Sequence, residues 1–118
     1  MKITKLPPDD PSVIITLSYN CYKRMIPVRD ILYCQAGRNY TKFFFTDGSH
    51  CLDSKSLKEI QKTLEPYGFL SIHKSYLVNG RHIRSLVSNG KCAVTLSNRT
   101  EVEVSRRRIP LVNKFFSM

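Results

Sequence analysis

Three short clusters of basic, amide and hydroxyl side chains stand out in this chain of 118 residues. The first cluster is Gly37-Arg38-Asn39-Tyr40, the second is His73-Lys74-Ser75, and the third is Ser105-Arg106-Arg107-Arg108. Guanidinium, ammonium and amide groups donate hydrogen bonds to phosphate oxygens and to the edges of bases. The three clusters are therefore candidate contact surfaces for a partner that is rich in hydrogen-bond acceptors.

The charge of the chain favours a polyanionic partner. The sequence holds 19 Lys and Arg against 9 Asp and Glu, which gives a formal net charge of +10. Nine of these bases but only two of the acids follow residue 70, and no acid occurs between Ser71 and Thr100. A field of that sign concentrates polyanions, so nucleic acid is the first candidate partner and an anionic membrane surface the second.

The third cluster adds an argument from helix electrostatics. Ser105 is a candidate N-cap of a terminal helix whose apolar face would comprise Ile109, Val112 and Phe116, although Pro110 would kink it. A helix dipole favours anions at the N-terminus by ~0.3–1 kcal/mol per charge, so three arginines there oppose it. A phosphate or a base edge explains them better than a purely structural helix does. For any one cluster alone, a solvated surface remains the other interpretation.

The sequence offers little support for a catalytic or a metal-binding function. The histidines come with no nucleophile elbow, no His-Glu-x-x-His helix and no phosphate-binding glycine loop. The cysteines form no Cys-x-x-Cys pair, which favours small buried thiols over zinc ligands. They are Cys21, Cys34, Cys51 and Cys92. We therefore expect no enzyme activity, no cofactor and no metal.

Short strands must position the clusters. Alternating apolar residues and turn signals predict strands at 13–19, 22–28, 31–36, 39–46, 49–52, 86–88, 91–97 and 101–104. Asp47-Gly48 and Asn89-Gly90 are hairpin turn signals. The run Phe43–Phe45 indicates burial on both faces or a bulge.

One helix is predicted between the strands. Ser56 and Glu59 have the spacing of a capping box, and apolar residues then share one face at helical spacing. These residues are Leu57, Ile60 and Leu64. Pro66 and Gly68 end the helix. The expected fold class is mainly β, with one short helix and a further candidate helix at the C-terminus.

Three segments carry a resemblance to a known family: IPVRDILYCQAGRNYTKFFFTDG, then SLKEIQKTLEPYGFLSIHKSYLVNGRHI, then VEVSRRR. From about Val13 to Phe116 the chain resembles the LytTR DNA-binding domain of bacterial transcriptional regulators. The most specific part runs from Phe69 to Ile83, where the pattern F-x-x-x-H-[KR]-S-Y-L-V-N is followed by Ile.

The resemblance implies an elongated stack of small antiparallel sheets that binds double-stranded DNA as a transcriptional regulator. Loop residues in successive major grooves would read the sequence, with base reading by Tyr40, Lys74 and Arg107. Flanking contacts would come from Arg38, Asn39, His73, Ser75 and Arg106. We also expect a monomer that pairs on tandem sites, and an upstream signalling domain or partner kinase system.

The remaining expectations concern boundaries and alternatives. Residues 1–12 are predicted as an extended lead or linker and residues 13–118 as the DNA-binding domain; with no signal-peptide pattern and no membrane span, we expect a cytoplasmic protein. His73 either faces DNA or holds its loop through a ring-to-backbone hydrogen bond. A competing class is an RNA or single-strand binder that stacks bases on Phe43–Phe45 and Tyr40. A third is a protein-interaction or sensor module for acidic partners.

Overall fold

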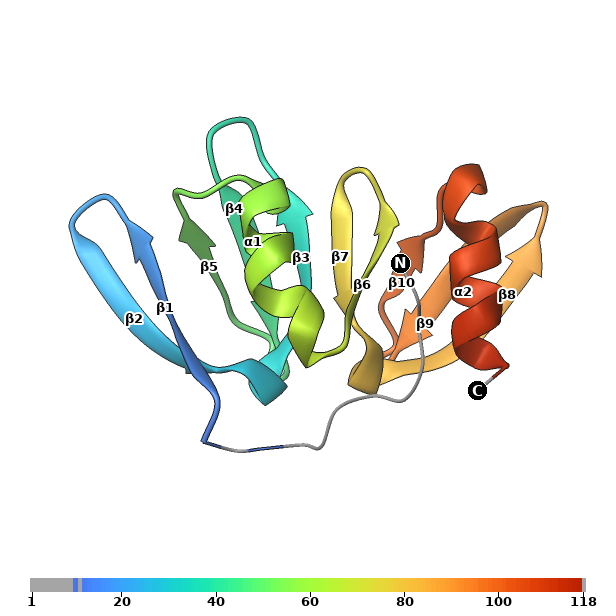
Figure 1. The fold of residues 1–118 in the computed structure, drawn as a ribbon, viewed down its shortest axis with the longest axis horizontal. Helices are drawn as coiled ribbons and strands as arrows, with labels where there is room; N and C mark the ends of the chain where they lie inside the picture. Colours follow the sequence, from blue (N-terminus) through green and yellow to red (C-terminus); the bar gives the residue numbers. More distant parts are fainter. Residues whose placement is uncertain (1–9, 11, 118) are drawn as a thin grey trace.

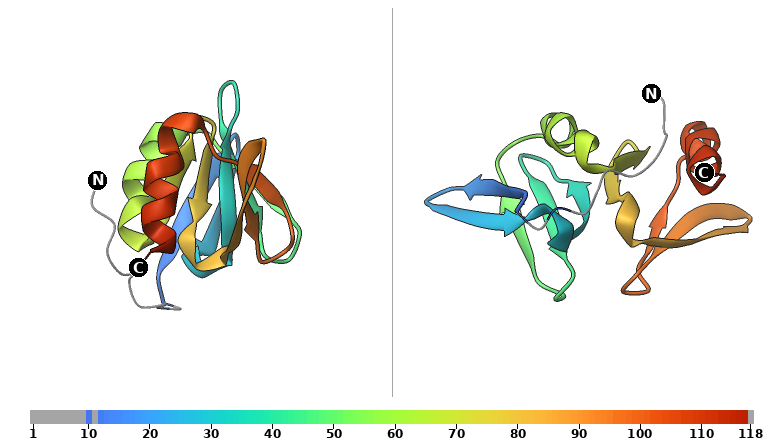
Figure 2. Two further views of the ribbon diagram at one scale, coloured as in Figure 1. Left: turned by 90° about the vertical axis from the view of Figure 1, so that its right-hand side faces the viewer. Right: turned by 60° about the horizontal axis from the view of Figure 1, so that its bottom comes forward.

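Three small antiparallel sheets lie side by side along the long axis of the molecule, with both helices on one side of them (Figures 1 and 2). The computed structural model describes residues 10 and 12–117, and the molecule measures 42 × 31 × 26 Å along its principal axes. The predicted fold class, mainly β and elongated, is confirmed. The lead predicted over residues 1–12 lies, apart from Asp10 and Ser12, outside the described residues.

The first sheet is the hairpin of β1 (Ile14–Tyr19) and β2 (Tyr22–Pro27), as predicted. It buries Leu17 and Ile26 against the central sheet. The buried carboxylate of Asp53 ties the hairpin down, since it accepts hydrogen bonds from the backbone N–H of Ser18 at 2.8 Å and of Lys55 at 2.7 Å. The bond from Ser18 connects β1 to Asp53, and the two bonds together satisfy the buried carboxylate.

The central sheet has five strands in the order β5-β4-β3-β7-β6. They are β3 (Ile31–Ala36), β4 (Thr41–Phe45), β5 (His50–Asp53), β6 (Phe69–His73) and β7 (Tyr76–Asn79). In β4, Phe43 and Phe45 are buried, while the half-buried Phe44 points to the other face and stacks on Tyr33 with ring centres 4.4 Å apart. The triplet thus alternates regularly, and the register irregularity lies in β3, between Ile31 and Tyr33.

Helix α1 (Leu57–Leu64) covers one face of this sheet and follows the predicted capping chemistry. The Ser56 hydroxyl accepts a hydrogen bond from the Glu59 N–H at 3.2 Å. Ile60 and Leu64 are buried in a first core, which α1 shares with the β1–β2 hairpin and the central sheet. A 3-10 turn and the left-handed Gly68, at φ 91°, then end the helix as expected.

The third sheet has the order β10-β9-β8, built from β8 (Ile83–Asn89), β9 (Lys91–Leu96) and β10 (Glu101–Glu103). Helix α2 (Ile109–Phe116) packs on it and completes a second core. Val94, Val102 and Val112 lie at its centre, each with at most 3% of its surface exposed. Two cores therefore stabilise the two halves of the elongated fold.

The start of the terminal helix differs from the prediction. Ser105 makes no capping bond through its side chain; Arg106–Arg108 form a 3-10 turn, and α2 begins at Ile109. Pro110 falls in the first helical turn, where its missing N–H costs nothing and its fixed φ suits a helix. The three arginines therefore lie in the turn directly before α2, with Arg108 at its N-cap position, and not in its first turn.

The cysteines are all free thiols; Cys34 and Cys51 are buried as expected, whereas Cys92 is only partly buried. Burial raises the pKa of the Cys34 thiol well above its usual value, with Cys51 adding to the effect. The expectation is wrong for Cys21, which is exposed because it lies in the two-residue turn between β1 and β2.

Candidate nucleic-acid interface

The three polar clusters lie along one edge of the molecule, the upper edge in Figure 1. The first cluster joins β3 to β4, the second joins β6 to β7, and the third joins β10 to α2. We call this edge, made of residues 37–40, 73–75 and 105–108, the loop edge. It contains every site residue predicted from the sequence: Arg38, Asn39, Tyr40, His73, Lys74, Ser75, Arg106 and Arg107.

The first cluster is a closed turn with two exposed side chains at its tip. The N–H of Gly37 donates to the Tyr40 carbonyl at 2.8 Å, and Arg38 and Asn39 are exposed between them. The Tyr40 ring lies over Gly37, so that a Cβ at Gly37 would overlap the ring. The same ring meets Tyr19 edge-on, with centres 6.1 Å apart. Tyr40 is thus held half-buried by its neighbours, while the tip is free to contact a ligand.

The second cluster is a tight turn braced by its own histidine. The backbone N–H of Ser75 donates to Nδ1 of His73 at 3.0 Å, and the His73 ring packs 5.1 Å from the Tyr76 ring. This is the ring-to-backbone bond that the structural interpretation of His73 requires. Lys74, at the tip, is exposed.

Hydrogen bonds connect the first cluster to the second. The N–H of Ala36, just before the first cluster, donates to the Ser75 carbonyl at 2.9 Å. The connection continues the pairing of β3 with β7, in which Gln35 lies opposite Tyr76. The spacing of the two turns is therefore set by a sheet rather than by flexible loops.

The third cluster is attached to β6, the strand that leads into the second cluster. The N–H of Ser105 donates to the Ile72 carbonyl at 2.9 Å. Nη1 of Arg108 donates to the Ser71 carbonyl at 3.1 Å and to its hydroxyl at 3.2 Å. Arg106 and Arg107 remain exposed. Of the three arginines, Arg108 is thus the one committed to contacts within the chain.

The link between Arg108 and Ser71 was not foreseen from the sequence. Ser71 is buried, with 6% of its surface exposed, in a strand otherwise filled with apolar residues. A polar side chain in the buried middle of a strand needs a hydrogen-bond partner. This requirement is the sequence signal that indicates a contact at Ser71. The identity of the partner, 37 positions away, follows only from the topology.

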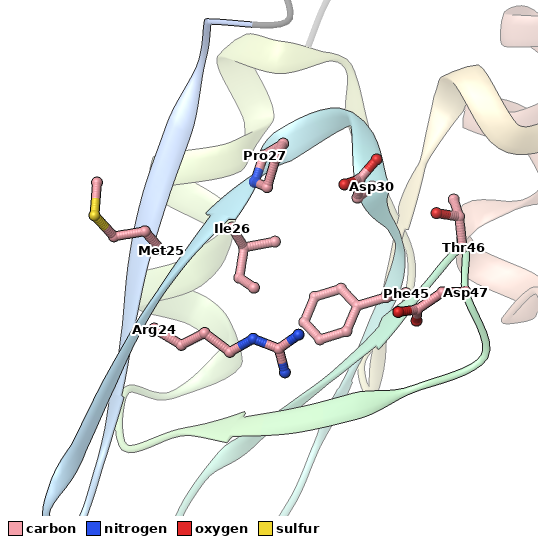
Figure 3. Close-up of a pocket in the computed structure, with 8 residues that line it drawn as sticks. All are labelled: Arg24, Met25, Ile26, Pro27, Asp30, Phe45, Thr46 and Asp47. Carbon is pink, nitrogen blue, oxygen red and sulfur yellow. The ribbon is translucent and has the colours of Figure 1, made fainter.

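A small hollow of about 160 Å³ lies away from the loop edge, between β2 and the turn after β4 (Figure 3). The guanidinium of Arg24 lies 5.5 Å from the centre of the Phe45 ring. Hydrogen bonds from the hydroxyl and N–H of Ser49 lower the pKa of the Asp47 carboxyl, and Arg24 adds to this effect. Arg24 is therefore engaged with its own chain.

Two negative findings concern the described residues. No group of three or more His, Cys, Asp or Glu among them could hold a metal ion. Neither α1 nor α2 is long and apolar enough to cross a membrane.

Comparison with known proteins agrees with the fold. The LytTr DNA-binding domain family matches residues 23–117. A solved structure described as the LytTr DNA-binding domain of a methyl-accepting/DNA response regulator from Bacillus cereus superposes with a TM-score of 0.75. It is 20% identical, and the match covers 89% of this chain and 97% of that one, which shows a shared fold. No significant match was found among curated proteins. Since the family match spans most of the chain, this protein belongs to the LytTR family of DNA-binding domains, which is not a catalytic family.

Proposed function

We propose that this domain regulates transcription by reading specific sequences of double-stranded DNA through the loop edge, with loop residues in successive major grooves. Tyr40, Lys74 and Arg107 contact base edges in this proposal. The remaining residues of the predicted site contact the phosphate backbone and position the domain: Arg38, Asn39, His73, Ser75 and Arg106. Phosphate contacts fix register while base contacts supply specificity.

The observation that carries the proposal is the loop edge itself. Three clusters that lie at least thirty positions apart in the sequence reach one edge, and backbone hydrogen bonds of 2.9 Å connect each to its neighbour. Their tips are exposed and carry guanidinium, amide and ammonium groups. A rigid row of such donors suits a ligand with regularly spaced acceptors, and duplex DNA is such a ligand.

The direction of the loop edge also supports this mode of binding. The loop edge follows the long axis of the molecule, and its first and third clusters belong to different halves of the fold (Figure 1). Turns that follow one another along a duplex can enter successive major grooves without a recognition helix.

Burial of the phenylalanines counts against the single-strand alternative. A stacking platform needs exposed aromatic faces, but Phe43 has none of its surface exposed and Phe45 has 4%. Phe44 is stacked on Tyr33 and lies 5.1 Å below the ammonium of Lys42. The burial of Phe43 and Phe45 and the stacking of Phe44 therefore count against the alternative platform of Phe43–Phe45 and Tyr40.

Three further features belong to the proposal. The free domain is mainly monomeric and pairs on tandem sites, because its short edge strands offer no extended apolar strand for a permanent dimer. It works in the cytoplasm. Its activity is controlled by an upstream signalling domain or a partner kinase system.

Substitution of Arg107 tests the assignment of base reading. A duplex site is first selected from a random pool, and each variant is then measured on that site and on a scrambled duplex at one salt concentration. Arg107→Ala should cost ~1–3 kcal/mol on the selected site and less on the scrambled one, because a forked contact to guanine is lost. Lys74→Ala should show the same preference with a smaller loss, since an ammonium does not make the forked contact.

Arg99 provides the matched control. It is exposed and equally charged, but it lies in the connection between β9 and β10, away from the loop edge. Arg99→Ala should weaken both duplexes alike or neither. Arg84→Ala is a less clean control, because Nη1 of Arg84 donates to the Arg81 carbonyl at 2.8 Å and the substitution would also remove this bond. Equal losses on both duplexes for Arg107→Ala would reduce Arg107 to a phosphate contact.

A further inference from the structure

The edge opposite the loop edge, the lower edge in Figure 1, carries a second group of basic side chains. Three connections meet there: the 3-10 turn Val28–Asp30 after β2, the 3-10 turn Gly80–His82 after β7, and residues 97–100 between β9 and β10. Together with the start of β8, they present Arg29, Arg81, His82, Arg84 and Arg99. We call the surface formed by these five residues the arginine edge.

Hydrogen bonds fix the arginine edge across the two halves of the fold. The His82 ring lies between two of the connections, with Nε2 2.9 Å from the Arg29 carbonyl oxygen and Nδ1 3.0 Å from the Ser97 hydroxyl oxygen. The N–H of Ser97 donates to the His82 carbonyl at 2.8 Å. Nη1 of Arg84 donates to the Arg81 carbonyl, also at 2.8 Å. The backbone positions of these residues are therefore fixed relative to one another.

The positive charge of the arginine edge is not neutralised within the described residues. The one ion pair in that part of the chain joins Lys55 to Asp53, and none of the four arginines takes part in it. Three of these arginines are exposed, and Arg81 is half-buried. Nη2 of Arg81 is buried and has no hydrogen-bond partner among the described residues, although buried donors normally have one. Charge that the chain leaves unpaired in this way attracts an anionic ligand.

A shallow hollow of about 460 Å³ lies in the arginine edge. Arg29, Arg81 and His82 line it, together with Asp30 and Thr46. The lining thus combines two guanidinium groups, which suit the forked binding of a carboxylate, with one carboxylate that accepts hydrogen bonds. These groups fit a ligand that carries carboxylates and also offers N–H donors, which is the chemistry of an acidic peptide.

We propose that the arginine edge binds an acidic segment of a partner protein. One carboxylate of the segment enters the hollow and accepts hydrogen bonds from Arg29 and Arg81, while a backbone N–H of the segment donates to Asp30. Neighbouring acidic residues of the segment pair with Arg84 and Arg99 beside the hollow. Charge complementarity selects this occupant.

A second nucleic acid fits this edge less well than an acidic peptide does. Phosphate groups offer no donor to Asp30, and its carboxylate repels them. Arg81 and His82 are half-buried, so a row of phosphates on a stiff duplex does not reach them as it reaches exposed tips. The three clusters of the loop edge, by contrast, contain no acid at all.

The position of the arginine edge gives this site its role. If the loop edge binds DNA, as proposed above, the arginine edge faces away from the duplex and stays accessible (Figure 1). The inference rests on the proposed function in this respect alone. The DNA-bound domain then offers a docking surface to another protein on its far side.

The first test titrates a short polyglutamate peptide, blocked at both ends, into isotope-labelled protein that is bound to the selected duplex. Because DNA covers the loop edge, the amide NMR signals of Arg29, His82 and Arg99 should shift and saturate, while those of residues 37–40 and 73–75 stay constant. A polylysine peptide of the same length should cause no shift. Shifts that are absent from the arginine edge, or that spread evenly over the surface, would overturn the site.

Neutral substitutions identify the side chains that bind. Arg29→Gln and Arg81→Gln should each weaken the peptide about tenfold, a usual effect of losing a hydrogen bond between charged groups. Arg29 is exposed, so its variant tests the site even where Arg81→Gln destabilises the fold. Lys58→Gln, an equal loss of charge on the exposed face of α1, should weaken the peptide much less. Equal losses for Lys58→Gln and Arg29→Gln would mean that the peptide follows net charge, and would refute the site.

A competition experiment separates the two classes of anion. A single-stranded oligothymidylate, added to the complex of protein, duplex and peptide at the concentration of the peptide, should leave the shifted signals of Arg29 and Arg99 in place. Displacement of the peptide from these residues by the oligonucleotide would make the arginine edge a second nucleic-acid site and would overturn the proposal.

The same peptide titration on the free protein separates this inference from the proposed function. The signals of Arg29 and Arg99 should shift and saturate without DNA as well. If they do so while the protein prefers no duplex sequence, the proposed function alone fails. If the sequence preference is present and these shifts are absent, the docking site alone fails.

Discussion

His73 braces the turn that carries Lys74, and this determines which of its ring nitrogens is free. Because Nδ1 accepts the Ser75 N–H at 3.0 Å, the neutral ring carries its proton on Nε2. That nitrogen can donate to a phosphate or base while the other holds the turn. The two interpretations drawn from the sequence are therefore compatible in a single side chain.

Gly37→Ala tests the contribution of Tyr40 without removing its phenol. A methyl group at this position overlaps the Tyr40 ring, which must swing away from its contact with Tyr19. We expect a small change in thermal stability, because the ring is half-buried and can move. We also expect affinity for the selected duplex to fall by ~1 kcal/mol or more, comparable to the loss of one base contact.

Tyr19→Ala is the matched control for this experiment. It removes the edge-on neighbour of Tyr40 but leaves the space above Gly37 open. If both variants bind the selected and scrambled duplexes as the wild type does, the position of the Tyr40 ring has no part in sequence reading.

Elements with strong local chemistry were predictable from the sequence. The capping box at Ser56 and the turns at Gly48 and Gly90, both with positive φ, appear where the residue types placed them. The start of α2 was not predictable in this way. Ser105 has the residue type of an N-cap, but Pro110 lies in the first turn of the helix that forms. Local patterns define where an element exists better than where it begins.

The attachment of the third cluster to β6 can be tested by a double-mutant cycle. Arg108→Ala should weaken binding to the selected duplex, because Arg106 and Arg107 lose the support of the bonds to Ser71. We expect the free energy of unfolding to fall by ~1–3 kcal/mol, the usual contribution of hydrogen bonds made by charged groups. The affinity for the selected duplex should fall in parallel. Ser71→Ala should have a smaller effect, since the bond to its carbonyl survives.

Coupling between the two substitutions is the decisive quantity. The double variant should lose less than the sum of the single losses, since both remove one interaction. Arg106 is an exposed neighbour, and the side-chain hydrogen bonds to Ser71 come from Arg108, so Arg106→Ala should instead be additive with Ser71→Ala. Arg108→Lys should restore part of the binding. Strict additivity for Arg108 and Ser71 would show that Arg108 acts on DNA directly.

At the scale of the whole molecule, the charge pattern and the three clusters predicted the class of partner, whereas the loop edge required the topology. Nothing in the sequence specifies that β3 pairs with β7, which lies more than forty positions away, yet that pairing joins the first cluster to the second. The family resemblance carried this long-range information. Residue types alone predict three separate surfaces, and each of them taken alone could be an ordinary solvated surface.

Salt dependence tests whether these surfaces act together as one electrostatic interface. Residues 71–118 hold nine Lys and Arg against two acids, and both acids lie on β10, outside the loop edge. If about five phosphates are neutralised, log K should fall with log salt at a slope of about −4 to −5 on any duplex. Arg106→Ala should reduce the slope by about 1, the value of one phosphate contact. Lys58→Ala, on the exposed face of α1, should leave the slope unchanged. A slope near zero for the wild type would mean that the basic half of the chain does not face the DNA backbone.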